Sequence, residues 1–150
     1  MAWSEPIFDR TQADIDYAIK MLQEWKENPS ATPFDLKGCF NVNDINRIED
    51  NIKYLSEELT KLYYFSNVES KTWEWGAFTV TTSEINRIRN NITILINSFF
   101  KDAKAPAIPD TLLTFQQVND LEQNLYLIKA MLDNMIRATK ECGVAECGEA

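Results

Sequence analysis

The sequence of 150 residues predicts an all-α protein built from four related amphipathic helices. A helix-start signature occurs four times, and each time a residue that caps helices is followed three positions later by Asp, Glu or Gln. After every signature, apolar residues recur at spacings of three and four, the period of a helix with one buried face. We therefore expect helices at about 11–27, 41–65, 81–101 and 114–139, in one domain that spans residues 1–150.

The four start signatures have the pattern of a capping box, in which the cap residue and the third helical residue satisfy each other's backbone N–H groups. They are Thr11-Gln-Ala-Asp14, Asn41-Val-Asn-Asp44, Thr81-Thr-Ser-Glu84 and Thr114-Phe-Gln-Gln117. In three copies an apolar residue stands before the cap and predicts a hydrophobic staple: Phe40, Val80 and Leu113. Arg10 takes this place in the first copy, where Phe8 is close enough to serve instead.

The apolar stripes that follow the signatures predict the buried faces of the helices. They comprise Ile15, Ala18, Leu22 and Trp25; Ile45, Ile48, Ile52, Leu55, Leu59 and Leu62; Ile85, Ile88, Ile92, Leu95 and Phe99; and Val118, Leu121, Leu125, Ile128, Leu132 and Met135. A closed four-helix bundle within one chain explains them. Long linkers and additional apolar residues beside the last two stripes favour instead an opened-out or oligomeric arrangement, and both alternatives stay open.

The segments between the predicted helices favour breaks in helical structure. Two prolines occur in 28–33 and two in 105–109, where they cannot continue a helix. The segment 72–80 alternates aromatic and β-branched residues, so we allow for a short β element there. Near the end of the chain, Gly143 and Gly148 predict that the last helix stops and that 140–150 form a flexible or arm-like terminus.

Composition narrows the classes of function. A formal net charge of −8 disfavours binding to nucleic acid, whose phosphates require Lys or Arg, and to acidic membrane surfaces. The chain has no histidine, so it lacks the commonest general base and metal ligand. The carboxylate pairs Glu49-Asp50 and Glu57-Glu58 are expected on a solvated helix face, without perturbed pKa values. We therefore predict that the protein is not an enzyme and binds no cofactor.

The three cysteines predict neither a metal site nor a disulfide framework. Cys142 and Cys147 are separated by more residues than the first pair of a usual zinc motif, and no histidine completes a ligand set with Cys39. The first residues lack the basic and apolar segments of a signal peptide. The most apolar stretch, 92–100, is far shorter than the ~20 residues that span a bilayer. We expect a cytoplasmically made protein without a membrane anchor.

An aromatic cluster around the second linker is the most distinctive local feature. Trp73, Trp75 and Phe78 lie close together, and Trp3 precedes its capping residue by the same eight positions as Trp73. Exposed tryptophans stack on sugars or anchor protein partners. The shared register of Trp3 and Trp73 favours a structural role at the ends of the core. We keep all four residues as candidate interaction residues.

Asparagines also recur at matching positions of the last three helices. Asn46, Asn86 and Asn119 follow the first apolar residue, and Asn51, Asn91 and Asn124 come five residues later. We expect these amides to bond to backbone near the helix start or to connect neighbouring helices, because a polar residue in an apolar seam fixes the register of packing.

Two segments of the chain resemble a module of small helical virion proteins. The segments are Phe40-Asn-Val-Asn-Asp-Ile-Asn-Arg-Ile-Glu-Asp-Asn-Ile-Lys-Tyr-Leu55 and Phe78-Thr-Val-Thr-Thr-Ser-Glu-Ile-Asn-Arg-Ile-Arg-Asn-Asn-Ile-Thr-Ile-Leu95. Their shared kernel, with Arg47 and Arg87, is similar to tail and baseplate components of phages and prophages of Gram-positive bacteria. The ending Cys147-Gly148-Glu149 also resembles the ends of such proteins. The first and fourth repeats have no Asn-Arg pair, so Arg47 and Arg87 have no counterparts there.

The resemblance implies a structural role in a virion, with the chain made in a bacterial host and assembled with itself and other virion proteins. It implies no catalysis and no cofactor. We expect Trp3, Trp73, Trp75, Phe78, Arg47 and Arg87 to be the interaction residues. The alternative is a cell-surface or glycan-binding module that uses the tryptophans.

Overall fold

The computed structural model describes residues 2–29, 36–75 and 79–149, with the backbone alone for 142–149. Its helices are α1 (Gln12–Glu27), α2 (Val42–Lys61), α3 (Thr82–Ser98) and α4 (Phe115–Glu149). The prediction of an all-α fold with four helices is confirmed. The described part of the chain has no strand, and this includes the described residues of 72–80, which are extended but pair with no other strand.

Each helix begins where its capping signature places it. The Thr11 and Asn41 side chains accept from the N–H groups of Asp14 and Asp44, whose carboxylates accept from the cap N–H in return. Thr81 caps α3 by accepting from the Glu84 N–H. Ahead of α4, the Gln117 amide oxygen accepts from the backbone of Thr114 at 3.1 Å, and the Thr114 hydroxyl accepts from the Gln117 N–H at 3.3 Å. Local sequence therefore sets all four helix starts.

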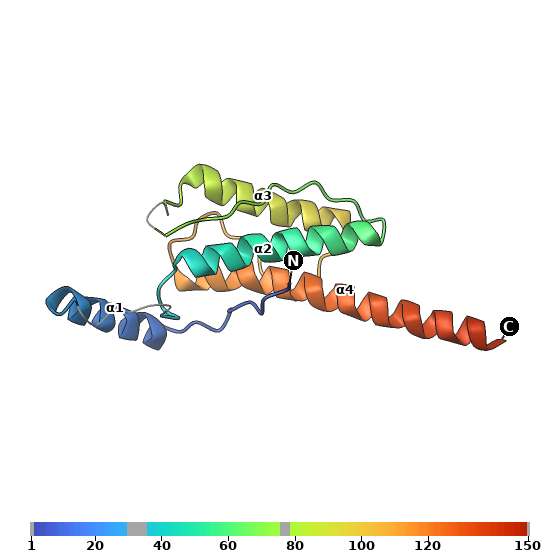
Figure 1. Ribbon diagram of the computed structural model, residues 1–150, viewed down its shortest axis with the longest axis horizontal. Coiled ribbons are helices and arrows are strands. Elements are labelled where there is room, and N and C mark those ends of the chain that lie inside the picture. The colour runs from blue at the N-terminus through green and yellow to red at the C-terminus, as the bar shows by residue number, and fades with distance from the viewer. Residues whose placement is uncertain (1, 30–35, 76–78, 150) are drawn as a thin grey trace.

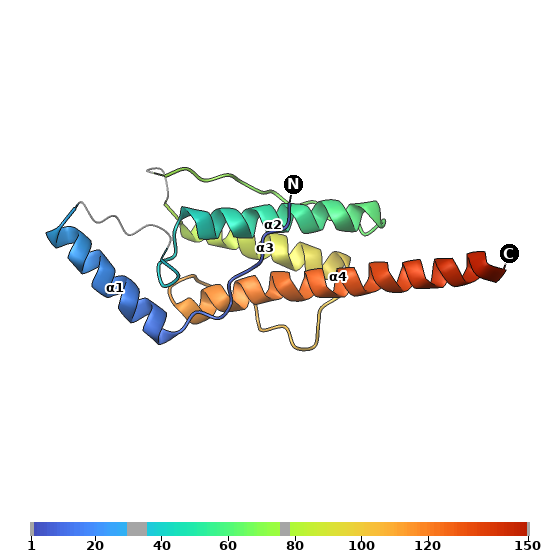
Figure 2. The same cartoon turned by 60° about the horizontal axis from the view of Figure 1, so that its bottom comes forward.

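Helices α2, α3 and α4 form a bundle, and α1 lies outside it. In Figures 1 and 2, α2, α3 and α4 lie side by side and run in the same direction, while α1 projects from the end at which they begin. Because parallel helices need long return connections, extended segments run back along the bundle between consecutive helices. Within the chain, the arrangement is a three-helix bundle with a separate α1 rather than a closed four-helix bundle (Figures 1 and 2). Oligomerisation stays a prediction.

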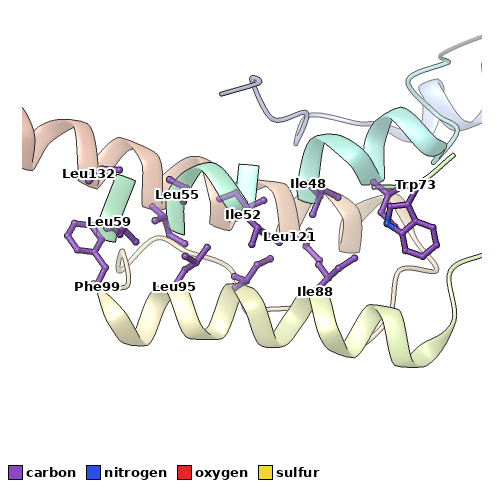
Figure 3. Close-up of a cluster of buried hydrophobic side chains, with 14 of the residues drawn as sticks. Ile48, Ile52, Leu55, Leu59, Trp73, Ile88, Leu95, Phe99, Leu121 and Leu132 are labelled. Atoms are coloured by element: carbon purple, nitrogen blue, oxygen red, sulfur yellow. The ribbon is translucent and has the colours of Figure 1, made fainter. Parts of the chain in front are cut away.

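The core is formed by the predicted stripes of α2, α3 and α4 (Figure 3). Its fully buried aliphatic residues are Ile45, Ile48, Ile52, Leu55, Leu59, Ile88, Ile92, Leu95, Leu121, Leu125 and Leu132. Each such side chain contributes roughly 1.5–3 kcal/mol by leaving water, and truncation to alanine in the middle of the core costs about 2–5 kcal/mol. Trp73 and Phe99 close the two ends of this core.

Helix α1 keeps most of its apolar stripe outside the bundle. Ala18 is its one buried residue, whereas Leu22 and Trp25 are both 39% exposed. The helix is held at its first turn by the loop before α2. At Gly38 a Cβ atom would lie 2.1 Å from the Asp14 carbonyl oxygen, so only glycine permits this approach.

Two predicted helix ends differ clearly from the structure. Helix α2 ends at Lys61 rather than near 65, because the N–H groups of Tyr63 and Tyr64 bond back to the carbonyls of Thr60 and Leu59. Helix α4 continues to Glu149, so our prediction that it ends near 139 was wrong. A glycine inside a helix costs only about 1 kcal/mol relative to alanine, which does not force the chain out of helix. The C-terminal part of α4 projects beyond the bundle (Figure 1).

Candidate functional site

Three extended segments lie against the bundle, and we call them the first arm (2–10), the second arm (64–75) and the third arm (100–113). They bring backbone polar groups next to helices whose apolar faces are already buried. Those groups need hydrogen-bond partners, because an unpaired buried N–H or C=O is costly. Asparagines of the helices supply the partners, and we call each such pairing an asparagine clasp.

In a clasp, one side-chain amide bonds to both the N–H and the C=O of a single arm residue, as a neighbouring strand would. Asn51 accepts from the Ser4 N–H at 3.0 Å and donates to the Ser4 carbonyl at 2.8 Å. Asn46 does the same with Trp73, at 2.8 and 2.9 Å. Helix α2 therefore holds both the first and the second arm.

The same arrangement recurs on the two other bundle helices. Asn91 of α3 clasps Glu69 at 3.1 and 2.7 Å, and Asn119 of α4 clasps Arg10 at 3.2 and 3.0 Å. We expected these asparagines to bond to helix starts or to neighbouring helices. They bond instead to the backbone of the first and second arms, and so they fix these extended segments against the bundle.

Two positions of the asparagine pattern are incomplete. Asn124 donates to the Pro106 carbonyl at 3.0 Å, but its own oxygen is buried and has no partner among the described residues. Proline has no N–H, which explains why this clasp has only half of its bonds. Asn86, the sequence counterpart of Asn46 and Asn119, is exposed, and its side chain makes no hydrogen bond to any described residue.

Two buried glutamates support the clasps. Glu49 is 0% exposed and accepts from the Lys71 N–H at 3.3 Å, from the Trp73 indole N–H at 3.2 Å and from Arg87. Our prediction that Glu49 lies on a solvated face was wrong. The arm folds back over this side of α2, and Arg87 compensates the buried charge.

Glu122 occupies the equivalent place on α4. It is also 0% exposed, and it accepts from the Ile7 N–H at 3.2 Å and from Arg10 Nη1 at 2.9 Å. Glu49 and Glu122 both stand three residues after a clasping asparagine. Arg10 and Trp73 are therefore structural counterparts, since each is clasped through its backbone and donates a side-chain N–H to one of these glutamates.

Arg47 and Arg87 connect neighbouring helices through these glutamates. Arg47 bonds to Asp44 of its own helix at 2.7 Å and to Glu122 of α4 at 2.6 Å. Arg87 bonds to Glu84 at 2.9 Å and to Glu49 of α2. In α2, the Asn-Arg pair of the kernel therefore has two functions: Asn46 clasps the second arm, and Arg47 forms an ion pair with α4.

The charges of this network perturb each other's protonation. Hydrogen bonding to Glu49 raises the pKa of Arg87 above its ordinary value. Burial opposes the charge of Arg47, but hydrogen bonds and attraction to Glu122 and Asp44 outweigh it, so the pKa of Arg47 is raised too. A hydrogen bond from Lys71, followed by one from Arg87, lowers the pKa of Glu84. All three shifts favour the charged forms, as in a structural ion-pair network.

The predicted interaction tryptophans differ in their exposure to solvent. Trp73 is 7% exposed and belongs to the core, so it offers no surface to a partner. Trp3 is half-buried against Tyr54, at 5.8 Å between ring centroids. Trp75 is 62% exposed. Phe78 lies outside the described residues. Trp3 and Trp73 are not in equivalent places, because arm backbones are positioned by the clasps and not by distance to the next cap.

Sequence reasoning missed an exposed aromatic cluster where α2 and α3 end. We call Tyr63, Phe65 and Phe100 the aromatic end; they are 83, 70 and 56% exposed. Tyr64 joins them to the core, with its ring 5.1 Å from Phe99 and 6.3 Å from Phe100. The signal in the sequence was the pair of aromatic runs, 63–65 and 99–100, at the ends of two apolar stripes.

A hollow of about 410 Å³ lies where α1 meets the bundle. Apolar side chains form most of its wall: Ile15, Phe40, Leu112, Leu113, Phe115 and Val118. Arg10 also lines it, but its guanidinium is already bonded to Glu122 and Asp44. The hollow therefore has the character of an apolar contact site.

The described residues contain no group of three or more Cys, Asp or Glu side chains placed to hold a metal ion. Cys39 is half-buried, and desolvation raises the pKa of its thiol, with a smaller contribution from Asp44. The side chains of Cys142 and Cys147 lie outside the described part. In the described chain, no helix has both the length and the apolarity required to cross a bilayer.

Comparison with family models, curated proteins and solved structures gives no match to this chain. Function is therefore inferred from the residues and their geometry.

Proposed function

We propose that this chain is a structural component of a phage particle, of the tail, baseplate or connector type, and that it acts by oligomerisation and by docking to other virion proteins. The proposal starts from the resemblance carried by the kernel around Arg47 and Arg87. In both copies this kernel builds the framework of the bundle, with an arginine that links two helices through a buried glutamate. Such a framework suits a structural protein, whose role requires a rigid subunit of defined shape.

The observation that carries the proposal is the exposed apolar face of α1. This helix has the same capping signature and apolar stripe as the three bundle helices, yet Leu22 and Trp25 remain partly in water. Ile19, beside them on the helix, is 49% exposed. Contiguous apolar surface of this kind is typical of a contact site with another protein.

The rigid arms also support an assembly role. A clasp fixes an arm residue through two bonds at once, and the clasps at Ser4, Glu69, Trp73 and Arg10 are distributed over two arms. A rigid subunit loses little conformational entropy when it binds, so repeated weak contacts suffice to build a symmetric particle.

Two measurements test this function. Sedimentation velocity over a concentration series should show self-association that Leu22→Glu abolishes and Gln23→Glu, which adds the same charge at the next residue, leaves intact. An antibody raised against the purified protein should label particles of the phage or induced prophage that encodes it. Strictly monomeric protein together with unlabelled particles would refute the proposal.

A second candidate is a glycan-binding module, which the 62% exposure of Trp75 favours. The burial of Trp73 means that the two tryptophans do not form a paired exposed platform. Quenching of tryptophan fluorescence by soluble cell-wall polysaccharide, lost in Trp75→Ala, would support it. An unchanged spectrum at saturating polysaccharide would remove it.

A further inference from the structure

We propose that copies of this chain associate head to tail, with α1 of one copy docked on the aromatic end of the next. This inference rests on the proposed assembly function and specifies the surfaces that perform it. It commits to a second copy of this chain as the occupant of both surfaces.

The two surfaces lie at opposite ends of the molecule. Figure 1 shows α1 beyond the end at which α2, α3 and α4 begin, whereas Tyr63 follows the last turn of α2 at the other end. The α1 of a chain therefore cannot reach its own aromatic end. Contact between different surfaces on two copies is heterologous, and it produces a ring when the rotation closes or a filament when it does not.

The α1 helix has an exposed apolar stripe and is acidic as a whole. Ile19, Leu22 and Trp25 are exposed on neighbouring turns. The helix carries four acidic residues, Asp14, Asp16, Glu24 and Glu27, against two lysines, Lys20 and Lys26. A partner should therefore offer apolar contacts with basic neighbours.

The aromatic end has this complementary character. Its exposed rings are followed or preceded by lysines, since Lys61 precedes Tyr63 by two residues and Lys101 follows Phe100 directly. Lys61 is paired with Glu58 of its own helix at 2.6 Å, so the excess of positive charge comes from Lys101 and Lys104, against Asp102. Long lysine side chains beside aromatic rings suit a helix that combines an exposed apolar stripe with a net negative charge.

The backbone at Tyr63 provides an independent argument. Tyr63 has φ of 68°, a left-handed conformation at the end of α2 that glycine adopts without strain. The tyrosine ring gains little within the chain, because it is 83% exposed and touches Phe65, which is itself exposed. An aromatic residue in a strained, exposed position indicates a contact made outside the chain.

A mixing experiment tests the head-to-tail arrangement on the full chain. Leu22→Glu damages the α1 surface and keeps the aromatic end, whereas Tyr63→Gly/Phe65→Ser damages the aromatic end and keeps α1. Gln23→Glu and Trp75→Ser are the matched controls. All variants change exposed side chains, and thermal unfolding should confirm that each folds, with Tyr63→Gly/Phe65→Ser at least as stable as wild type.

Each damaged variant alone should be monomeric by sedimentation velocity, with association weakened at least about tenfold, as expected for loss of central contact residues. An equimolar mixture of the two should form one-to-one dimers that grow no further, because each dimer has one intact interface and two damaged surfaces. Both controls should assemble as wild type does.

The outcomes separate this inference from the proposed function. Assembly that Leu22→Glu abolishes but Tyr63→Gly/Phe65→Ser preserves would overturn the head-to-tail arrangement and leave assembly through α1 standing. A wild-type chain that stays monomeric at all concentrations would overturn the head-to-tail arrangement, and unlabelled particles would in addition refute the proposed function. A charge swap adds a second criterion: Lys101→Glu/Lys104→Glu should weaken assembly, and mixing with Asp16→Lys/Glu27→Lys, which changes exposed acids on the side of Ile19, should restore it.

Discussion

The side-chain amide of Asn46 pairs with both backbone polar groups of Trp73, donating at 2.9 Å and accepting at 2.8 Å across 27 residues of sequence. This pairing places the Trp73 ring in the core and its indole N–H on Glu49. The same bonds that hold the arm therefore also seal one end of the bundle.

The Asn46 clasp should be essential for stability, in contrast to its exposed sequence counterpart. Asn46→Asp keeps the shape but replaces the donor with a carboxylate oxygen that faces the Trp73 carbonyl. We expect a loss of about 2–3 kcal/mol, because a buried acceptor is left unpaired and a charge is added. Asn86→Asp should change the free energy of unfolding by less than about 0.5 kcal/mol. Urea unfolding of both variants measures the difference, and equal losses would show that the clasp contributes nothing specific.

The extent to which the structure follows from the sequence depends on the range of the interactions. Capping boxes and apolar stripes are local, and they predicted the four helix starts and the core of α2, α3 and α4. The environment of Glu49 could not be predicted in this way, because its partners Lys71, Trp73 and Arg87 lie 22, 24 and 38 residues along the chain. Periodicity alone assigned Glu49 to the polar face, which it occupies, but the arm covers that face.

The same distinction between local and long-range interactions applies to the candidate contact surface on α1. The stripe of α1 was predicted, but its exposure was not. The first repeat does differ in sequence, because it has Ala18 where α2 and α3 have isoleucine and Arg10 in place of a staple residue. These differences did not reveal that Arg10 turns inward and that this helix lies outside the bundle.

Arg10 should be among the most sensitive charged residues of the chain. Its guanidinium bonds to Asp44 at 3.0 Å and to Glu122 at 2.9 Å, with about 3% of the side chain exposed. Arg10→Met leaves these carboxylates with less compensation, so we expect a loss of about 3–5 kcal/mol in unfolding free energy. Lys37→Met, which breaks an exposed pair with Asp9, should cost less than about 1 kcal/mol. Similar midpoints for the two variants in guanidinium chloride would argue against a buried network.

Glu84 should contribute to acid sensitivity. Its pKa is lowered in the folded chain, first by a hydrogen bond from Lys71 and then by one from Arg87. A depressed pKa gives stability that is present above the unfolded value and lost as the pH falls through the folded value. The advantage of wild type over Glu84→Gln should therefore narrow from about pH 5 downward, by about 1 kcal/mol or less for a pair this exposed. Glu57→Gln, at an exposed position, is the control; a constant gap between wild type and Glu84→Gln would contradict the assignment.

Gly38 should control the attachment of α1. A Cβ atom there would lie within 2.1 Å of the Asp14 carbonyl oxygen and 2.8 Å of the Ile15 nitrogen, both backbone atoms that cannot turn aside. Gly38→Ala should therefore detach the loop from the first turn of α1, while the core of α2, α3 and α4 stays folded. Hydrogen exchange should become at least about tenfold faster in α1 amides and stay unchanged at the centre of α2. Uniformly faster exchange would mean that α1 and the bundle unfold as one unit.

The half-filled clasp at Asn124 gives the most selective prediction, because it distinguishes two prolines of the same arm. Pro106→Ala introduces an N–H beside the unpaired Asn124 oxygen, whereas Pro109→Ala adds an N–H that has no known acceptor. Both changes lose the rigidity of proline, worth about 0.4–1 kcal/mol in the unfolded chain. A new hydrogen bond to a buried acceptor returns about 0.5–1.5 kcal/mol, so Pro106→Ala should be more stable than Pro109→Ala by about 1 kcal/mol. In an Asn124→Leu background, where the acceptor is absent, this difference between the two proline variants should disappear. Persistence of the difference there would show that it arises from the arm itself and not from completion of the clasp.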